Sequence, residues 1–286
     1  MKRTNKPIII DALRLCFEVD NQYYINQLKA LEIGDRFDFQ HFYLFRIEGK
    51  YFDNVYLIRV LIDEKVIDFG ELKFNLNAGD EESNTHKNGK QKVWLSVNNQ
   101  AFYNNTLCYY DYISDVLGLR LHNITTLDLC TDVSFDVAKK IKSCIRNKDI
   151  TTILNGKKIR DRDKDRPEIS YIYSGSLNRD KYMSIYIKQK KSIKDKSKGI
   201  TLTAYNKRAE IKNSSGKDYI SEFYSNPKNL YRLEIHLNNE EVKSYFNSQP
   251  IDFYYWILQS EEVLKKMFIN HLNSQSLKRH YTFDCQ

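Results

Sequence analysis

Two stretches of the chain combine side chains that can act on phosphodiesters. Both alternate apolar and polar residues with period two, which is the pattern of a half-buried strand. They are Thr-Leu-Thr-Ala-Tyr-Asn-Lys at 201–207 and Tyr-Arg-Leu-Glu-Ile-His-Leu at 231–237. Tyr205 and Lys207 lie on the polar face of the first strand. Glu234 and His236 lie on the polar face of the second. A phenol nucleophile beside a metal-binding carboxylate is the combination that a covalent phosphodiester reaction requires.

A third alternating segment, residues 124–133, adds Asp128 and Asp132 to its polar side. Carboxylate oxygens are hard ligands that favour Mg²⁺ or Mn²⁺. On a regular strand the two Cα atoms lie roughly 13 Å apart, at about 3.3 Å per residue, so both acids cannot hold one ion. We therefore predict Asp128 and Glu234 as the metal ligands. His236, two residues from Glu234, and Asp132 are further candidate ligands.

The charge is concentrated in one part of the chain. The net charge over 286 residues is +8, but residues 139–200 contain 19 Lys or Arg and only 7 Asp or Glu. Such a basic stretch is typical of a protein that binds a polyanion, and nucleic acid is the most common one. A solvated basic surface without a partner is the alternative. A membrane surface is disfavoured because the stretch has no amphipathic apolar face.

Several classes of protein are disfavoured by the composition. No apolar run reaches 18 residues, and the run at 8–10 is too short for a secretory signal, so we expect neither a transmembrane helix nor a signal peptide. The five cysteines are scattered and never in Cys-x-x-Cys spacing. This scattered arrangement argues against a structural zinc site and for a reducing, cytoplasmic location. No strand-to-helix junction carries a glycine-rich phosphate loop, so nucleotide hydrolysis has no support.

The remaining segments must position these residues. Strands are expected at 7–19, 42–47, 55–62, 66–74, 93–97, 169–174 and 182–188. Helices are expected at 21–33, 106–118, 134–146, 240–246 and 253–272. The helix at 106–118 should end at Gly118, and Ser134 should cap the next one. Strands in hairpin-like groups interrupted by helices predict an α+β fold on a largely antiparallel sheet.

The chain order suggests three segments with different roles. Residues 1–105 form a strand-rich half, and residues 106–238 form the half that carries the chemistry, within the same compact unit. Residues 239–286 form a C-terminal helical segment.

Four short segments follow one another in an informative order. They are Leu127-Asp128-Leu129-Cys130-Thr131-Asp132, Tyr171-Ile172-Tyr173-Ser174-Gly175-Ser176, Ala204-Tyr205-Asn206-Lys207-Arg208-Ala209-Glu210 and Tyr231-Arg232-Leu233-Glu234-Ile235. This order resembles that of the plasmid rolling-circle replication initiators of the Rep-trans type, over roughly residues 93–238. Two positions depart from the family: Thr126 stands where an arginine is frequent, and His236 stands in place of a second glutamate. The resemblance implies a relaxase-like, RRM-like sheet, a divalent metal and site-specific nicking of a plus origin.

Two tyrosines fit the nucleophile position that the resemblance implies. Tyr205 lies nearer in sequence to the glutamate strand, and Lys207 beside it can favour the phenolate or contact a phosphate. Tyr186 has the better spacing from the glycine of the second motif. A hairpin of strands 182–188 and 200–207 would hold both tyrosines near each other. We prefer Tyr205 and keep Tyr186 as the alternative nucleophile.

The resulting prediction is a metal-dependent DNA nickase. Tyr205 would attack a phosphodiester, keep a 5′-phosphotyrosine link and release a 3′-OH that primes rolling-circle replication. The implied partner is DNA at a single-stranded or cruciform plus origin; a host helicase and a second copy of the chain are further candidate partners. The alternatives are a non-catalytic DNA-binding protein on the same fold and a phage-type nicking initiator or relaxase. A tyrosine recombinase is disfavoured because no histidine begins a His-x-x-Arg box.

The basic stretch leads to a prediction about the salt dependence of DNA binding. The residues expected to contact phosphates are Lys157, Lys158, Arg160, Arg162, Lys188, Lys190, Lys191, Lys194 and, outside the stretch, Arg232. Each lost contact should lower the slope of log K against log salt by about 0.7–0.9, so neutralising four residues of the stretch should flatten it by roughly three. Fluorescence anisotropy with origin DNA measures the slope. Neutralising four lysines outside residues 139–200 is the matched control, and an unchanged slope in the first variant would mean that the stretch is only solvated.

Overall fold

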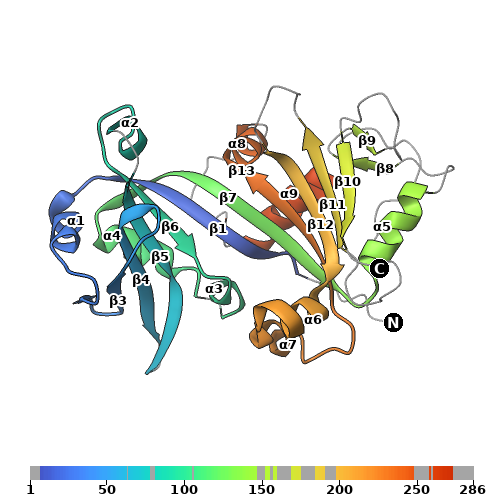
Figure 1. The fold of residues 1–286 in the computed structure, drawn as a ribbon, viewed down its shortest axis with the longest axis horizontal. Helices are drawn as coiled ribbons and strands as arrows, with labels where there is room; N and C mark the ends of the chain where they lie inside the picture. The colour runs from blue at the N-terminus through green and yellow to red at the C-terminus, as the bar shows by residue number, and fades with distance from the viewer. Residues whose placement is uncertain are drawn as a thin grey trace. The chain divides into compact units, whose positions relative to one another are not determined.

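The computed structural model describes residues 7–62, 64–77, 81–104, 106–146, 152–154, 157–159, 169–174, 184–190, 198–247, 258 and 260–272. These residues form an α+β fold with an 11-stranded sheet flanked by helices (Figure 1). Each strand pairing whose register is defined is antiparallel, which confirms the expected fold class. Within these ranges, every helix is too short or too polar to cross a bilayer.

The chain divides into two compact units. The N-terminal unit is Ala12–Leu127, and the C-terminal unit combines Met1–Asp11 with Asp128–Gln286. Two long strands, β1 (Ile9–Val19) and β7 (Leu119–Val133), contribute residues to both. These boundaries differ from those of the expected segments 1–105, 106–238 and 239–286, whose separate roles stay a prediction.

The N-terminal unit contains the strand order β7-β1-β6-β5-β4-β3-β2. The strands expected at 42–47, 55–62 and 66–74 are its β3, β4 and β5. Its elements besides β1 and β7 are α1 (Gln22–Lys29), β2 (Arg36–Asp38), β3 (Phe42–Ile47), β4 (Phe52–Ile62), β5 (Lys65–Leu76), α2 (Glu81–Asn84), β6 (Lys92–Val97), α3 (Gln100–Tyr103) and α4 (Tyr109–Val116). The helix α4 is followed by Gly118 with a φ of +65°, which confirms the glycine stop because this left-handed conformation favours glycine.

The C-terminal unit contains the strand order β10-β11-β12-β13-β7-β1. Its further elements are α5 (Val137–Arg146), β8 (Thr152–Leu154), β9 (Lys157–Ile159), β10 (Ile169–Ser174), β11 (Ser184–Lys190), β12 (Lys198–Asn206), α6 (Lys207–Glu210), the π-helical turn η1 (Ile211–Ser215), α7 (Asp218–Phe223), β13 (Tyr231–Asn238), α8 (Asn239–Asn247) and α9 (Glu261–Leu272). The expected cap of α5 is wrong by two residues. Asp136, not Ser134, precedes the helix, and its Oδ1 accepts from the amide of Lys139 at 2.8 Å.

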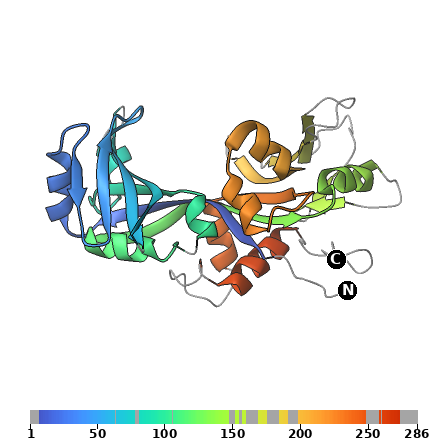
Figure 2. The same ribbon diagram turned by 90° about the horizontal axis from the view of Figure 1, so that it is seen from below.

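Strands β12 and β13 are covered by helices on both faces. Their apolar row is buried as the alternation predicted, with Leu202 opposite Ile235 and Ala204 opposite Leu233. Helices α6 and α7 lie on one face of these strands and α9 lies on the other (Figure 2). No helix or strand was expected at residues 211–230. Instead they contain η1 and α7, so the polar face of the two strands is partly enclosed.

A buried ion-pair network joins three strands of the C-terminal unit. Arg232 on β13 donates from Nε and Nη2 to the two carboxylate oxygens of Asp132 on β7, at 2.8 and 2.6 Å. Its Nη1 pairs with Asp11 on β1. The side chains of Arg232 and Asp132 are both 0% exposed, so neither charge is solvated by water. Each charge depends on the other for compensation, because an unpaired buried charge is strongly unfavourable.

This network predicts a large loss of stability when one partner is removed. Asp132→Ala should lower the free energy of unfolding by about 3–5 kcal/mol, because Arg232 then stays buried with too little negative charge. Urea unfolding measures the change. The control is Asp68→Ala, which removes the partner of Arg59 in an exposed pair and should lower it by at most about 1 kcal/mol. Equal effects of the two substitutions would contradict this account of the network.

Candidate functional site

The register of β12 and β13 places the predicted nucleophile beside the predicted acid. Tyr205 lies opposite Arg232, and Thr203 lies opposite Glu234. Directly opposite residues share a face of the sheet, so these four side chains lie on the same face. The Tyr205 hydroxyl donates a hydrogen bond to Oε2 of Glu234 at 3.2 Å.

The structure also brings Asp128 and His236 together. β7 is the neighbour of β13 in the sheet, and Nδ1 of His236 contacts Oδ1 of Asp128. Their side chains are 35% and 15% exposed for His236 and Asp128, so solvent reaches this edge of the site. His236 was predicted as a further metal ligand. In this arrangement its Nδ1 instead orients the carboxylate of a predicted ligand.

Negative charge accumulates around Tyr205. Burial, followed by the charges of Asp11 and Asp128, raises the pKa of Glu234 to about 7, although neighbouring cations act in the opposite direction. Burial and the Glu234 charge raise the pKa of the Tyr205 phenol well above its ordinary value. The phenol is therefore neutral in this arrangement. A divalent cation bound among the three carboxylates would relieve their repulsion, and oxygen donors of this kind suit Mg²⁺ or Mn²⁺.

Lys207 lies near Tyr205, but it belongs to a helix and not to the strand on which it was expected. The strand β12 ends at Asn206, whose Oδ1 accepts from the amide of Ala209 at 2.9 Å and so caps α6. Lys207 is therefore the first residue of a helix and not part of the strand face. Its buried ammonium lies 5.6 Å from the centroid of the Tyr205 ring and pairs with Glu210 at 2.8 Å. The cation is close to the phenol, but its charge is already compensated.

The second candidate nucleophile lies on the adjacent strand. β11 and β12 form the antiparallel hairpin that the sequence predicted, and the backbone of Tyr186 pairs with Thr203. Thr203 in turn pairs with Glu234, so Tyr186, Thr203 and Glu234 occupy one row across three strands. The side chain of Tyr186 lies outside the described part of the structure. The register therefore leaves the choice between the two tyrosines open.

Two further predicted site residues belong to the buried ion pair. Both oxygens of Asp132 accept from Arg232, and neither side chain is exposed. Asp132 therefore does not offer a ligand atom to the open part of the site. The assignment of Arg232 as a DNA contact is corrected in the same way, because a guanidinium enclosed by carboxylates cannot reach a phosphate in this arrangement.

Most of the predicted phosphate contacts fall where side chains are not described. Lys157 and Lys158 lie on β9, and Lys188 and Lys190 lie on β11, each with only the backbone described. The others, Arg160, Arg162, Lys191 and Lys194, lie outside the described residues. The basic surface stays a prediction.

Asp11 and Lys217 were missed by the sequence reasoning. Asp11 is an acid at the end of the apolar run 8–10, and it approaches Arg232 and Glu234 only because β1 lies beside β7. An acid within an apolar strand was the available signal. Lys217 precedes α7; burial lowers its pKa, while the charge of Asp11 acts in the opposite direction. Nothing in the local sequence of residues 211–230 indicates that this lysine comes near the site.

No three of the described acids around Tyr205 have their ligand atoms within 4.8 Å of one another. Among the described residues, one group of three His, Cys, Asp or Glu side chains has its ligand atoms all within 4.8 Å of one another, and it is Glu18, His86 and His122 in the N-terminal unit. The acids around Tyr205 are close enough to repel but do not meet this spacing. An ion that used three of these acids would have to draw their ligand atoms closer together.

A scan against protein-family models and a search of the curated proteins found no match for the chain. The similarity to the Rep-trans initiators therefore stays a resemblance between short motifs. The site described above consists of residues from all of β1, β7, β12 and β13, together with the start of α6.

The raised pKa of Glu234 predicts a pH-dependent difference in stability. Between about pH 4.5, where the unfolded carboxyl titrates, and about pH 7, where the folded one does, the folded state binds more protons and the protein loses stability as the pH rises. Glu234→Gln has no such charge, so in chelator at pH 8 it should be more stable than the wild type by up to about 3 kcal/mol. The difference should disappear below pH 4.5. Urea unfolding across this range measures it, with the exposed Glu32→Gln as control; a gap that does not change with pH would contradict the crowding of carboxylates.

Proposed function

We propose that the chain is a metal-dependent DNA strand transferase that nicks a plus origin through Tyr205 and so initiates rolling-circle replication. One observation carries the proposal. The Tyr205 hydroxyl lies 3.2 Å from Oε2 of Glu234, inside a group of carboxylates that includes Asp11 and Asp128. Titratable groups with shifted pKa values gather at functional sites more often than elsewhere.

The residues around Tyr205 can handle the proton of the reaction. The phenol must lose a proton as its oxygen attacks phosphorus, and the oxygen that accepts its hydrogen bond belongs to Glu234. Without a metal this carboxylate has a pKa of about 7, and the oxygen that accepts the hydrogen bond from Tyr205 is placed to take its proton. The P–O bond to Tyr205 forms as the bond from phosphorus to the 3′ oxygen breaks. The departing oxygen takes its electron pair and a proton from water, which leaves a 3′-OH and a 5′-phosphotyrosine.

The metal of this proposal is Mg²⁺ or Mn²⁺, and the residues that would hold it are Asp128 and Glu234, with Asp11 nearby. When bound, such an ion supplies positive charge to the scissile phosphate and its transition state. His236 would keep the Asp128 carboxylate oriented through its Nδ1 contact. Lys207 lies beside the Tyr205 ring at the start of α6, and its pairing with Glu210 reduces the positive potential that it can add at the phosphate.

The fold and the charge distribution are compatible with a nucleic-acid partner. The antiparallel arrangement of β10 to β13 next to β7 supports a relaxase-like, RRM-like sheet as part of this proposal. The basic stretch 139–200 includes β8 to β11, and single-stranded or cruciform origin DNA is the proposed ligand. A host helicase and a second copy of the chain are further proposed partners.

A non-catalytic DNA-binding protein is the second candidate function, and two observations favour it. The pKa of Tyr205 is raised and not lowered, and the Lys207 ammonium is paired with Glu210. A phenol of this kind is a poor nucleophile without further charge from a metal or the substrate. The two functions differ in whether a covalent adduct forms.

The decisive experiment is adduct formation on labelled origin DNA in Mn²⁺. Tyr205→Phe should abolish the covalent protein–DNA adduct and leave DNA binding unchanged, since it removes only the attacking oxygen. Tyr186→Phe is the matched control on the neighbouring strand and should keep at least part of the nicking. Peptide mapping of the wild-type adduct identifies the tyrosine directly.

Metal dependence completes this test. Adduct formation should stop in EDTA and return with Mn²⁺ or Mg²⁺, and Glu234→Ala should bind origin DNA without cleaving it. Mapping to Tyr186 would transfer the nucleophile to β11 and keep the enzyme. DNA binding without any adduct under all conditions would instead establish the non-catalytic function.

A further inference from the structure

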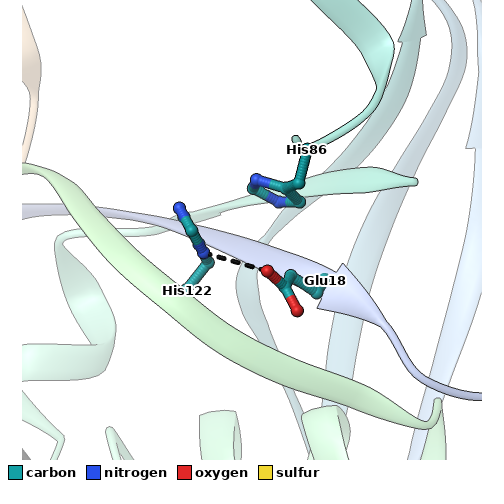
Figure 3. A group of neighbouring side chains, drawn as sticks. All are labelled: Glu18, His86 and His122. Atoms are coloured by element: carbon teal, nitrogen blue, oxygen red, sulfur yellow. Dashed lines mark hydrogen bonds and ion pairs between the residues drawn. The ribbon is translucent and has the colours of Figure 1, made fainter. Parts of the chain in front are cut away.

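Two histidines and a glutamate converge in the N-terminal unit, and none of them takes part in the proposed reaction. Glu18 lies near the end of β1, His122 lies on β7, and His86 lies on the turn that precedes β6 (Figure 3). Each offers one ligand atom, and these atoms all lie within 4.8 Å of one another. The two imidazole rings are tilted by 43° to each other, with centroids 4.1 Å apart.

The hydrogen bonding of His86 leaves one ring nitrogen unprotonated and able to bind a metal ion. Its Nε2 lies 3.2 Å from the carbonyl oxygen of Phe17, and a carbonyl only accepts, so Nε2 carries the proton. Burial lowers the pKa of His86 and keeps the ring neutral. Nδ1 therefore holds the lone pair. Metal-binding histidines commonly donate their other N–H to a backbone carbonyl in this way, because it fixes both the tautomer and the ring orientation.

His122 and Glu18 are already spaced like two ligands of one ion. Nδ1 of His122 lies 3.1 Å from Oε1 of Glu18. A tetrahedral ion about 2.1 Å from each ligand sets neighbouring ligand atoms about 3.4 Å apart. An ion can therefore take the place of the proton between these two groups. The His122 side chain is 39% exposed, which gives an ion access from solvent, while that of Glu18 is 8% exposed.

The turn that carries His86 is tied to the same place. The amide of His86 donates to the carbonyl of Lys90 at 2.8 Å, and Nδ2 of Asn88 donates to Oε1 of Glu18 at 3.2 Å. Burial acts to raise the pKa of Glu18, but the hydrogen bonds from Arg120 and Asn88 and the nearby positive charges together lower it below its ordinary value. Glu18 is therefore anionic, as a metal ligand must be.

We propose that Glu18, His86 and His122 form a binding site for a divalent transition-metal ion of the Zn²⁺ class. Two of the three donors are imidazole nitrogens, which suit Zn²⁺, Co²⁺ or Ni²⁺ and not the hard ions Mg²⁺ and Mn²⁺ favoured by the acids near Tyr205. With two histidines and one carboxylate the fourth position stays open to water. The ion would join β1, β7 and the turn before β6 within one unit.

Three positively charged side chains near the site would repel a bound metal ion unless their charges are compensated. Arg120 pairs with Oε2 of Glu18 at 2.6 Å and also with Asp20, so the ion would bind Oε1, which also accepts from Asn88. Lys92, opposite Glu18 on β6, donates to the carbonyl of Ser83 at 3.2 Å. Lys90 pairs with Asp20. Acidic partners thus offset much of the positive charge, and the affinity comes from the imidazole nitrogens more than from net charge.

Zinc binding to the metal-stripped full chain tests the site directly. In excess Mg²⁺, which occupies any hard-ligand site, calorimetry should show one Zn²⁺ bound per chain with release of protons. His86→Ala and His122→Ala should each weaken Zn²⁺ binding by at least about tenfold. His41→Ala, which removes an exposed histidine of the same unit, and Glu234→Ala, which alters the proposed catalytic face, should leave it unchanged.

A second measurement needs no substitution and so does not depend on the folding of variants. One equivalent of Zn²⁺ should shift the imidazole ¹⁵N resonances of His86 and His122 in the wild-type spectrum and leave that of His41 in place. Unshifted His86 and His122 resonances, or equal Zn²⁺ affinity in the double variant His86→Ala/His122→Ala, would overturn the proposal. Neither measurement depends on nicking activity, so the zinc site and the proposed function are tested independently of each other.

Discussion

The buried pairing of Arg232 with Asp132 and Asp11 is the constraint on which the geometry of the C-terminal unit depends. The guanidinium and the Asp132 carboxylate are fully enclosed, so they can exist as charges only in contact with each other. Because the three residues come from β13, β7 and β1, this requirement fixes how the strands align. Glu234, two residues beyond Arg232 on the same face, then has only one place to lie. Buried pairs of this kind contribute little net stability, but they make wrong alignments of the strands strongly unfavourable.

The same constraint explains the electrostatics around Tyr205. Aligning the strands places Asp128, Asp11 and Glu234 within range of one another, and the helices α6 and α7 lie over that face (Figure 2). Repulsion and burial both raise the pKa of Glu234, and the Tyr205 phenol beside it becomes harder to ionise. Such an arrangement is unfavourable for folding and useful for binding a cation, since a positive ion reverses both effects. Groups that destabilise the fold, such as these buried and mutually repelling carboxylates, are expected mainly at functional sites.

The two units offer different chemistry to metal ions. The C-terminal unit has carboxylates and a phenol, which are oxygen donors, whereas the N-terminal unit has two imidazoles and one carboxylate. Cysteine spacing argued against structural zinc, but that reasoning concerns only thiolate sites. The histidines of the N-terminal unit lie at 86 and 122 and the glutamate at 18, with no short spacing to connect them. Strand order brings them together: β7 and β6 both lie beside β1, and His86 lies on the turn that enters β6.

The sequence by itself determined the strands and the rows of residues along them. Period two is a local property, so the alternation at 201–206 and 231–237 correctly predicted that Leu202, Ala204 and Ile235 are buried. The hairpin of β11 and β12 was predictable for the same reason, because its partners are close in the chain. Only the tertiary structure decided what each polar residue does. Asp128 and Asp132 look alike on one strand, yet one contacts His236 in the site and the other pairs with a buried arginine 100 residues away. Asp11 is 221 residues from the same arginine. A charge takes its role from the group that compensates it, and when that group is distant in the chain, only folding places the two together.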